Sequence, residues 1–169
     1  MEYHDKEWGA PVYDDNKIFE FLVLESFQAG LSWRTVLDKR ENFERAFAGF
    51  NPSKVAGFGR KDISHLLKDK GIIRNRAKIE AAINNARRFL EVQKEFGKFS
   101  KYMWSFTGNK PIKNKIRKLS DYKTSSEEAE LMAKDLKKRG FKFLGPTTIY
   151  AHMQAVGMVN DHMTGCFKR

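Results

Sequence analysis

GIIRNRAK, at residues 71–78, joins two stretches that carry the apolar spacing of helices. Asp62 can cap a helix over residues 63–70, which ends at Gly71. A longer helix is predicted over residues 75–96, because its apolar side chains recur on one face and a glycine follows. Two helices joined by a glycine-containing turn expose backbone N–H groups, and the positive end of the second helix faces the same way. The stretch is therefore a candidate phosphate-binding hairpin, and an ordinary helix–helix connection is the alternative.

This pair of helices, at about residues 62–95, resembles a helix-hairpin-helix, a unit that binds the DNA backbone. The common form of that unit has a second glycine two residues after the first, where this chain has Ile73. Basic side chains beside the turn would meet the phosphates, and apolar ones would anchor the turn to the core. The candidate DNA-binding residues of the hairpin are Gly71, Ile72, Arg74, Arg76 and Lys78.

Helical patterns separated by short breaks account for most of the remaining chain. Capping side chains precede several of them, at residues 14–16, at Asn51 before Pro52, and in a capping box at residues 125–128. The further helices are predicted over residues 16–29, after Asn51, and over residues 99–106, 125–139 and 147–156.

Strand patterns are thin by comparison. Residues 142–144 are too short to anchor a sheet, and the polar, lysine-rich residues 107–124 are predicted to form a surface loop. We therefore expect an all-α, compact helical bundle with two closely packed helical lobes, forming a single domain over residues 1–169.

The composition indicates a globular protein that meets polyanions. Hydrophobic residues make up 41% of the chain, which differs from the signature of disorder. No apolar run approaches the roughly 18 residues of a membrane span, and no signal-peptide core is seen, so we expect a cytoplasmic protein. The single cysteine excludes an internal disulfide. The net charge of +11 favours nucleic acid as the partner, and a surface that is merely basic is the alternative.

Glu25 stands out as a carboxylate in an apolar helical segment, between Leu24 and Phe27. Burying an unpaired carboxylate is costly, so such a residue needs a partner or a function. From the pattern alone, a surface glutamate or one paired with an arginine is the alternative.

Two local sequences are unusual, YHDKEWG at residues 3–9 and LESFQAGLSW at residues 24–33. Both resemble segments of the 3-methyladenine DNA glycosylase I family. So do residues 75–86, KRGFKFLG at residues 138–145 and MQAVGMVNDH at residues 153–162. Because these motifs follow one another in the family's order over nearly the whole chain, the chain is identified as a member of that family.

The resemblance implies a pocket for a base that is flipped out of duplex DNA. Adenine methylated at N3 carries a positive charge, so an aromatic face and a nearby anion can select it. By resemblance, Glu25 hydrogen-bonds the base and complements its charge, and Trp33 stacks on it. Tyr3 adds a phenolic hydrogen bond, and Trp8 lines the wall.

The implied reaction is hydrolysis of the N-glycosidic bond of 3-methyladenine in alkylated double-stranded DNA, which releases the base. Glu25 is the catalytic candidate, as a recognition and electrostatic residue, because the aspartate that related glycosylases carry downstream of the hairpin has no match here. No lysine lies in a recognisable Schiff-base setting, so we expect no strand-cleaving lyase activity. Gly30 and Leu31 join the DNA-binding candidates, with Leu31 as a wedge for the gap in the base stack.

His162 and Cys166 are four positions apart, a spacing that alone is more often packing than a metal site. Members of the family hold a structural zinc ion that ties the two termini together. Carried over to this sequence, its ligands are His4, His162 and Cys166. The family's fourth ligand, an N-terminal cysteine, has no counterpart before His4, so the zinc site is expected with one ligand missing from this chain. His65 and His152 lie outside the motifs and are interpreted as structural or surface residues.

Three other functions stay open. A non-catalytic helix-hairpin-helix DNA-binding module would use only the hairpin and the basic surface, and would not need Glu25 among aromatic residues. A related glycosylase could accept a broader set of alkylpurines. An RNA-binding protein could stack its aromatic side chains on unpaired bases. For the glycosylase we expect a monomer without membrane contact.

Overall fold

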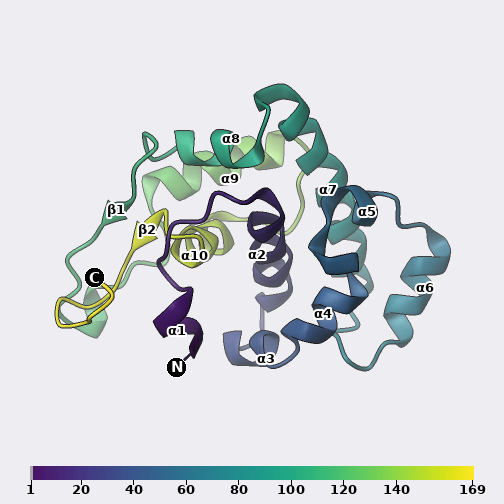
Figure 1. The fold of residues 1–169 in the computed structure, drawn as a ribbon, viewed down its shortest axis with the longest axis horizontal. Helices are drawn as coiled ribbons and strands as arrows, with labels where there is room; N and C mark the ends of the chain where they lie inside the picture. Colours follow the sequence, from purple (N-terminus) through teal and green to yellow (C-terminus); the bar gives the residue numbers. More distant parts are fainter. Residues whose placement is uncertain (1) are drawn as a thin grey trace.

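Helices dominate residues 2–169, the part of the chain that the computed structural model describes (Figure 1). The helices are α1 (Glu2–Lys6), α2 (Asp15–Gln28), α3 (Trp33–Leu37), α4 (Arg40–Ala46), α5 (Pro52–Ala56), α6 (Arg60–Lys68), α7 (Arg76–Phe96), α8 (Phe99–Ser105), α9 (Glu127–Lys138) and α10 (Pro146–Ala155). Short 3-10 turns are η1 (Ala48–Phe50) and η2 (Leu119–Asp121). The strands β1 (Ile112–Lys113) and β2 (Val159–Asn160) pair in parallel. The all-α prediction is confirmed, with this small ribbon added to it.

Helix α2 lies between two groups of helices, one that includes α5, α6 and α7 and one that includes α9 and α10, and it contacts both groups (Figure 1). It packs against α7 on one side and against α10 on the other. Residues 21–27 of this helix are all buried, which is typical of a helix that is covered on every face. One cluster of buried apolar residues extends from Val55 and Leu66 through α2 to Met132 and Ile149. The two groups of helices therefore share a core.

The three capping segments expected from the sequence do cap helices, and Asn75 caps a fourth. Asp14 accepts the backbone N–H of Lys17 at 2.8 Å at the start of α2. Asn51, Asn75 and Ser126 occupy the same position in α5, α7 and α9 and accept a backbone N–H three residues on. Each side-chain oxygen satisfies an N–H that the helix itself cannot, which fixes where the helix begins.

Helix α6 differs from the prediction at both ends. It begins at Arg60, so Asp62 lies inside the first turn, where its carboxylate accepts the Gly59 N–H at 2.8 Å. The last helical residue is Lys68, because Asp69 already has an extended backbone. The cap predicted at Asp62 is therefore wrong, although the same carboxylate still stabilises the helix start from within.

Residues 107–124 contain regular structure and a buried residue, unlike the surface loop predicted for them. They contain β1, and Ile116 is 2% exposed and forms an isolated parallel bridge with Met163. The sequence pattern also missed α1, α3 and α4, which have 5, 5 and 7 residues. Helices of one to two turns carry too few apolar repeats for their periodicity to be recognised.

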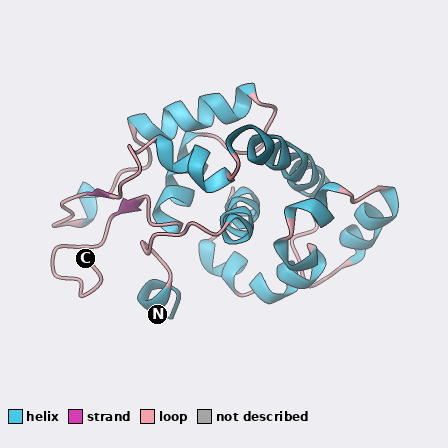
Figure 2. Cartoon of the chain, turned by 45° about the horizontal axis from the view of Figure 1, so that its top comes forward, coloured by secondary structure: helices cyan, strands magenta, loops and turns pink. Residues whose placement is uncertain are grey.

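The chain termini lie on the same side of the molecule (Figure 2). Two backbone hydrogen bonds tie the segment after α1 to the end of α10, from Gly9 N to Gln154 O at 3.0 Å and from Val12 N to Val156 O at 3.0 Å. The β1–β2 pair holds the C-terminal segment beside them. This arrangement places α1 next to the last residues of the chain.

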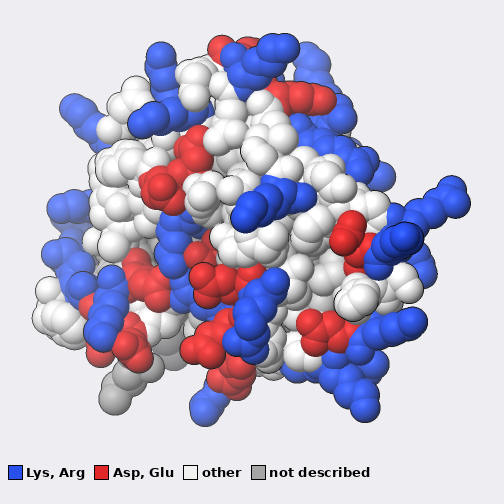
Figure 3. Space-filling model, turned by 45° about the vertical axis from the view of Figure 1, so that its right-hand side comes forward, with Lys and Arg blue, Asp and Glu red and all other residues white. Residues whose placement is uncertain are grey.

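Charged side chains of both signs are interspersed on the face shown in Figure 3. Lys and Arg predominate there and project mostly at its edges, while Asp and Glu lie between them. The positive charge is therefore distributed over this face rather than gathered in one continuous stripe. Among the described residues, no helix combines the length and the apolar character needed to cross a bilayer.

Candidate active site

The residues predicted to hold a base line one cavity, although they come from three parts of the chain. Tyr3 lies in α1 and Trp8 in the turn after it, Glu25 lies in α2, and Trp33 is the first residue of α3. The cavity has a volume of about 240 Å³. Its other lining residues are Gln28, Ala151 and Gln154. The structure thus brings together all four residues expected at the base pocket.

Glu25 is 4% exposed and contributes the carboxyl group of this cavity. Burial raises the pKa of Glu25 to about 8, because nothing among the described residues compensates for the loss of water. At neutral pH this burial favours the protonated carboxyl group, which a positive charge nearby would help to ionise. A surface glutamate, the alternative from the sequence, is excluded by this burial.

Aromatic rings form the walls around Glu25. The Tyr3 and Trp33 ring centroids are 5.6 Å apart, with the planes tilted by 55°. Burial, and next the charge of Glu25, raise the pKa of the Tyr3 hydroxyl, so this group remains a neutral hydrogen-bond donor. Ser32 caps α3 by accepting the Thr35 N–H at 3.2 Å, which sets Trp33 at the start of that helix.

Gln154 is a lining residue to which the sequence analysis gave no role. Its Nε2 donates to Asp161 Oδ2 at 2.7 Å. Asp161 is 1% exposed and also accepts from the Tyr150 hydroxyl and from Asn114 Nδ2, each at 2.7 Å. A carboxylate can only accept, so the amide nitrogen of Gln154 must face Asp161 and its oxygen must face away. The only signal in the sequence was its place in the motif at residues 153–162.

The segment after α2 has a constrained backbone. Gly30 has φ 81°, a conformation that side-chain-bearing residues rarely adopt. Gln28 Nε2 donates to Leu31 O at 2.6 Å, and Leu31 N donates to Gln28 O at 2.7 Å. The Leu31 side chain is 39% exposed. Leu31, the residue predicted as the wedge, thus lies at the surface and is hydrogen-bonded to Gln28, which lines the cavity that holds Glu25.

The hairpin at residues 69–75 has the expected place between α6 and α7, with Ile72 buried and Arg74 and Arg76 exposed. One detail differs from the prediction, because the Gly71 N–H donates to Asp69 Oδ1 at 2.7 Å and is already paired. Gly71 also packs closely, since a Cβ atom there would lie 3.0 Å from the Asn42 side chain. A side chain at position 71 would press on Asn42, and the Gly71 N–H is paired with Asp69 rather than directed at a phosphate.

Lys78 requires a correction as well. It was predicted to bind DNA together with the arginines, but it is 7% exposed. Its Nζ donates to Phe27 O at 2.9 Å and to Ala29 O at 2.7 Å. The ammonium group is thus occupied by the end of α2 rather than directed at solvent. Sequence alone could not reveal this, because the partners are backbone carbonyls remote in the chain.

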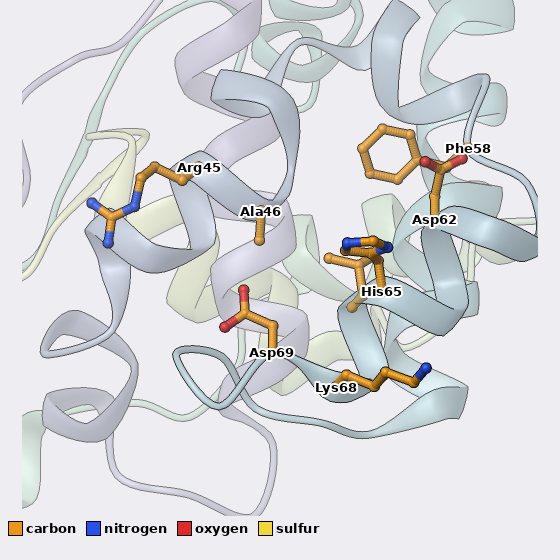
Figure 4. A pocket seen from close by; sticks show the side chains of 8 residues that line it. Arg45, Ala46, Phe58, Asp62, His65, Lys68 and Asp69 are labelled. Carbon is orange, nitrogen blue, oxygen red and sulfur yellow. The ribbon is translucent and has the colours of Figure 1, made fainter.

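A larger cavity, of about 550 Å³, lies between α4 and α6 (Figure 4). Asp62, His65 and Asp69 are among the residues that line it. None of the residues predicted for the base pocket lines this cavity, and its carboxyl groups, Asp62 and Asp69, are exposed and half-buried, respectively. A buried carboxyl group with a strongly raised pKa is the better indicator of a functional site, so we favour the smaller cavity.

The predicted metal ligands also come together. The ligand atoms of His4, His162 and Cys166 all lie within 4.8 Å of one another. His4 Nε2 is 3.8 Å from Cys166 Sγ, and the buried His162 Nε2 has no hydrogen-bond partner among residues 2–169. His162 Nδ1 lies 2.8 Å from Asn160 Oδ1 and His4 Nδ1 lies 2.9 Å from Asp5 Oδ1.

The contacts with Asn160 and Asp5 determine which nitrogen of each imidazole carries the proton. Because Asn160 Oδ1 and the Asp5 carboxylate can only accept, the Nδ1 atoms of His162 and His4 donate and their Nε2 lone pairs face the cluster. Burial, and next the charge of His4, lower the pKa of His162, which favours the neutral form that binds metals. Three residues here therefore fit a metal ion. The Trp8 ring, whose centroid is 4.6 Å from that of the His162 ring, lies between this cluster and the cavity that holds Glu25.

Comparison with known proteins gives a consistent result. The family model described as methyladenine glycosylase matches residues 1–169. DNA-3-methyladenine glycosylase 1 of Escherichia coli is 48% identical over 166 residues, which span 98% of this chain and 89% of that protein. The DNA-3-methyladenine glycosylase of Haemophilus influenzae is 47% identical over 166 residues, spanning 98% of this chain and 90% of that protein.

Solved structures agree with these sequence relatives. A 3-methyladenine DNA glycosylase I from Staphylococcus aureus, whose structure concerns recognition of 3-methyladenine, superimposes with a TM-score of 0.96. It is 42% identical and the match covers 98% of this chain and 88% of that chain.

Proposed function

The chain belongs to the methyladenine glycosylase family, and on that premise we infer that it hydrolyses the N-glycosidic bond of 3-methyladenine in alkylated DNA. One observation carries this assignment: the buried carboxyl group of Glu25 lines a cavity walled by Tyr3, Trp8 and Trp33. A module that only grips the DNA backbone would have no use for such a cavity. The enzyme is therefore a DNA repair glycosylase.

Selection of the damaged base follows from charge. Adenine alkylated at N3 is cationic while it is attached to the sugar, and a cation over an indole face is stabilised by roughly 2 kcal/mol or more when water is excluded. Trp33 would supply that face. The same cation would lower the pKa of Glu25 from about 8, so that the carboxyl group ionises as the base enters. Neutral adenine would leave Glu25 protonated and gain neither interaction.

Bond cleavage needs little help from the protein once the cation is bound. As the bond between C1′ and the purine nitrogen breaks, its electron pair neutralises the purine and leaves positive charge on the sugar. Water then adds to C1′, loses a proton to solvent and completes an abasic site. We assign to Glu25 the stabilisation of positive charge through this step, with Tyr3 donating a hydrogen bond to the base.

The DNA duplex would be held on the side of the hairpin and of Leu31. Arg74 and Arg76 are exposed at the start of α7, where the helix dipole also favours phosphate. Leu31 would enter the gap that the flipped base leaves. We propose no lyase activity, because no lysine among residues 2–169 lines the base cavity and the ammonium group of Lys78 is bound to backbone carbonyls.

We propose that His4, His162 and Cys166 hold a structural zinc ion. Zinc would cross-link α1 to the C-terminal segment and so stabilise the wall that Trp8 contributes. Metal analysis of the purified protein is expected to give close to one zinc per chain, and His162→Ala to lose it. The exposed His65, in α6, offers the control His65→Ala. No bound zinc, or equal zinc in His162→Ala, would contradict the proposal.

The test of function is release of bases from methylated duplex DNA, with each released base identified by chromatography. We expect 3-methyladenine as the main product, and its loss in Glu25→Gln. Glu44→Gln, on the exposed face of α4, is the matched control and should retain wild-type release. Release of other alkylpurines at similar rates would indicate the broader glycosylase. Duplex binding without any base release would indicate the non-catalytic module.

A further inference from the structure

Lys78 connects two parts of the molecule that the proposed function uses separately. It lies in the first turn of α7, directly after the hairpin, and its Nζ reaches Phe27 O at 2.9 Å and Ala29 O at 2.7 Å. Those carbonyls belong to the last turn of α2 and the residue after it. The lysine thus joins the start of one helix to the end of another.

This position is unfavourable for a lysine by the usual rules. A cation in the first turn of a helix opposes the dipole of that helix, and burial lowers the pKa of Lys78 because the charged form loses water. The exposed Arg74 and Arg76 on the same hairpin incur little of that cost. The end of α2 compensates for it, because carbonyls there have no partner within their own helix and the dipole favours a cation.

The α2 end is also the segment that links the base cavity to the wedge. Glu25 lies one turn before Ala29, and Ala29 is followed directly by Gly30 and Leu31. Gln28 lines the cavity and donates to Leu31 O at 2.6 Å, and the Leu31 N–H donates to Gln28 O at 2.7 Å, so hydrogen bonds tie Leu31 to a residue of the cavity wall. Lys78 is hydrogen-bonded to two residues of this segment, and it follows the hairpin directly in the chain.

We propose that Lys78 is a positioning residue that fixes Leu31 relative to the hairpin, so that gripping the DNA backbone places the wedge in the base stack. This inference rests on the proposed glycosylase function. It assigns base eversion, rather than base binding or backbone binding, as the step that depends on Lys78. A lysine that merely stabilised the fold would affect all three steps together.

The experiment compares Lys78→Met with the wild-type protein in three measurements. Methionine has a similar length and no charge or donor. The first measurement is the affinity for free 3-methyladenine, detected by the change in tryptophan fluorescence. The second is the affinity for undamaged duplex DNA. The third is the single-turnover rate of 3-methyladenine release from methylated duplex DNA at saturating protein. Lys94→Met, on the exposed face of the same helix, is the matched control for loss of one positive charge.

For Lys78→Met we expect a release rate at least about tenfold lower, with both affinities within about threefold of wild type. Lys94→Met should match wild type in all three. A release rate within about twofold of wild type would overturn the inference. So would a loss of affinity for free 3-methyladenine in proportion to the loss of rate, because that pattern indicates a collapsed base cavity.

A double variant tests whether Lys78 acts through the wedge. If it does, Lys78→Met combined with Leu31→Ala should be no slower than the slower single variant, since both remove the same step. Multiplied effects would overturn this part. If Lys78→Met does not fold by circular dichroism, Lys78→Gln, which retains one N–H donor group, is measured against the same criteria.

The outcome separates this inference from the function on which it rests. If the wild-type protein releases no 3-methyladenine, the proposed function fails. If the wild-type protein is active and Lys78→Met releases 3-methyladenine at the wild-type rate, only the positioning role fails.

Discussion

Gly157 lies so close to Ala10 that a Cβ atom at position 157 would stand 2.3 Å from the Ala10 carbonyl carbon. Gly157 also has φ 71°, which side-chain-bearing residues rarely adopt. The strap at residues 9–12, which leads back to Trp8, can therefore pack on the end of α10 only if position 157 has no side chain. Packing of two backbones here determines one wall of the base cavity.

Gly157→Ala is expected to lower the free energy of unfolding by about 3 kcal/mol or more, because the clash with Ala10 adds to the strain of a positive φ. Urea unfolding followed by circular dichroism measures this. Gly145→Ala is the control, since Gly145 has φ −73° and open space around it. Equal stability of the two variants would show that the strap can move away from α10 at little cost.

Glu25→Gln is expected to stabilise the fold while it abolishes base release. The pKa of Glu25 is about 8 in the folded protein and about 4.5 in the unfolded chain. Between these values the folded state holds one proton more, so wild-type stability falls as pH rises, by up to about 1.4 kcal/mol per pH unit. The glutamine variant lacks this loss. The difference between its free energy of unfolding and that of the wild type should therefore grow from pH 4.5 to about pH 8 and then level off.

Chemical unfolding of both proteins at several pH values measures that difference. Glu44→Gln should show no such trend. A difference in stability between Glu25→Gln and wild type that is constant across the range would mean that the Glu25 carboxyl group ionises at the same pH in the folded protein as in the unfolded chain.

His152 should make the fold sensitive to acid. It is fully buried, its Nδ1 has no partner among the described residues, and burial lowers its pKa to about 3. Between pH 3 and pH 6.5 the unfolded chain binds the extra proton, so stability falls as pH drops through this range. His152 is expected to lower the free energy of unfolding by up to about 1.4 kcal/mol for each pH unit of this range, and His152→Leu should remove this contribution.

Thermal unfolding of wild type and His152→Leu from pH 7 to pH 4 tests this expectation. His65→Leu serves as the control because His65 is exposed. Parallel stability curves for wild type and His152→Leu would show that His152 does not govern the acid response.

Trp33→Leu is expected to reduce the rate of 3-methyladenine release by about 30-fold, which corresponds to about 2 kcal/mol of cation–π stabilisation. Leucine keeps an apolar wall but lacks the electron-rich face. Tyr13→Leu, at an aromatic residue that is 57% exposed and stacks on Trp104, is the control. A loss in Trp33→Leu of less than about threefold would argue against stacking of the cationic base on this ring.

The long helices and their caps were predictable because their signals are local. Asp14, Asn51 and Asn75 each act within three residues of their own position, so a linear pattern contains all the information. The short helices α1 and α3 carry no such pattern, yet they supply Tyr3 and Trp33. Here the family motifs, rather than periodicity, identified the residues.

The parts that could not be predicted depend on contacts between distant positions. The burial of Lys78 depends on two carbonyls of α2, and the orientation of Gln154 depends on Asp161. The Gly71 N–H is taken by a neighbouring carboxylate, which no charge pattern reveals. A basic residue beside a hairpin suggests a phosphate ligand, but only the folded chain shows which cations remain accessible.

The base cavity joins Tyr3 and Trp8 from one end of the chain to Ala151 and Gln154 near the other. During synthesis on a ribosome, the hairpin and its exposed arginines are complete well before α10 has emerged. A nascent chain that has not yet reached α10 therefore has no chamber in which to cut a glycosidic bond. The order in which the chain is made keeps the hydrolytic centre unassembled until α10 has been translated.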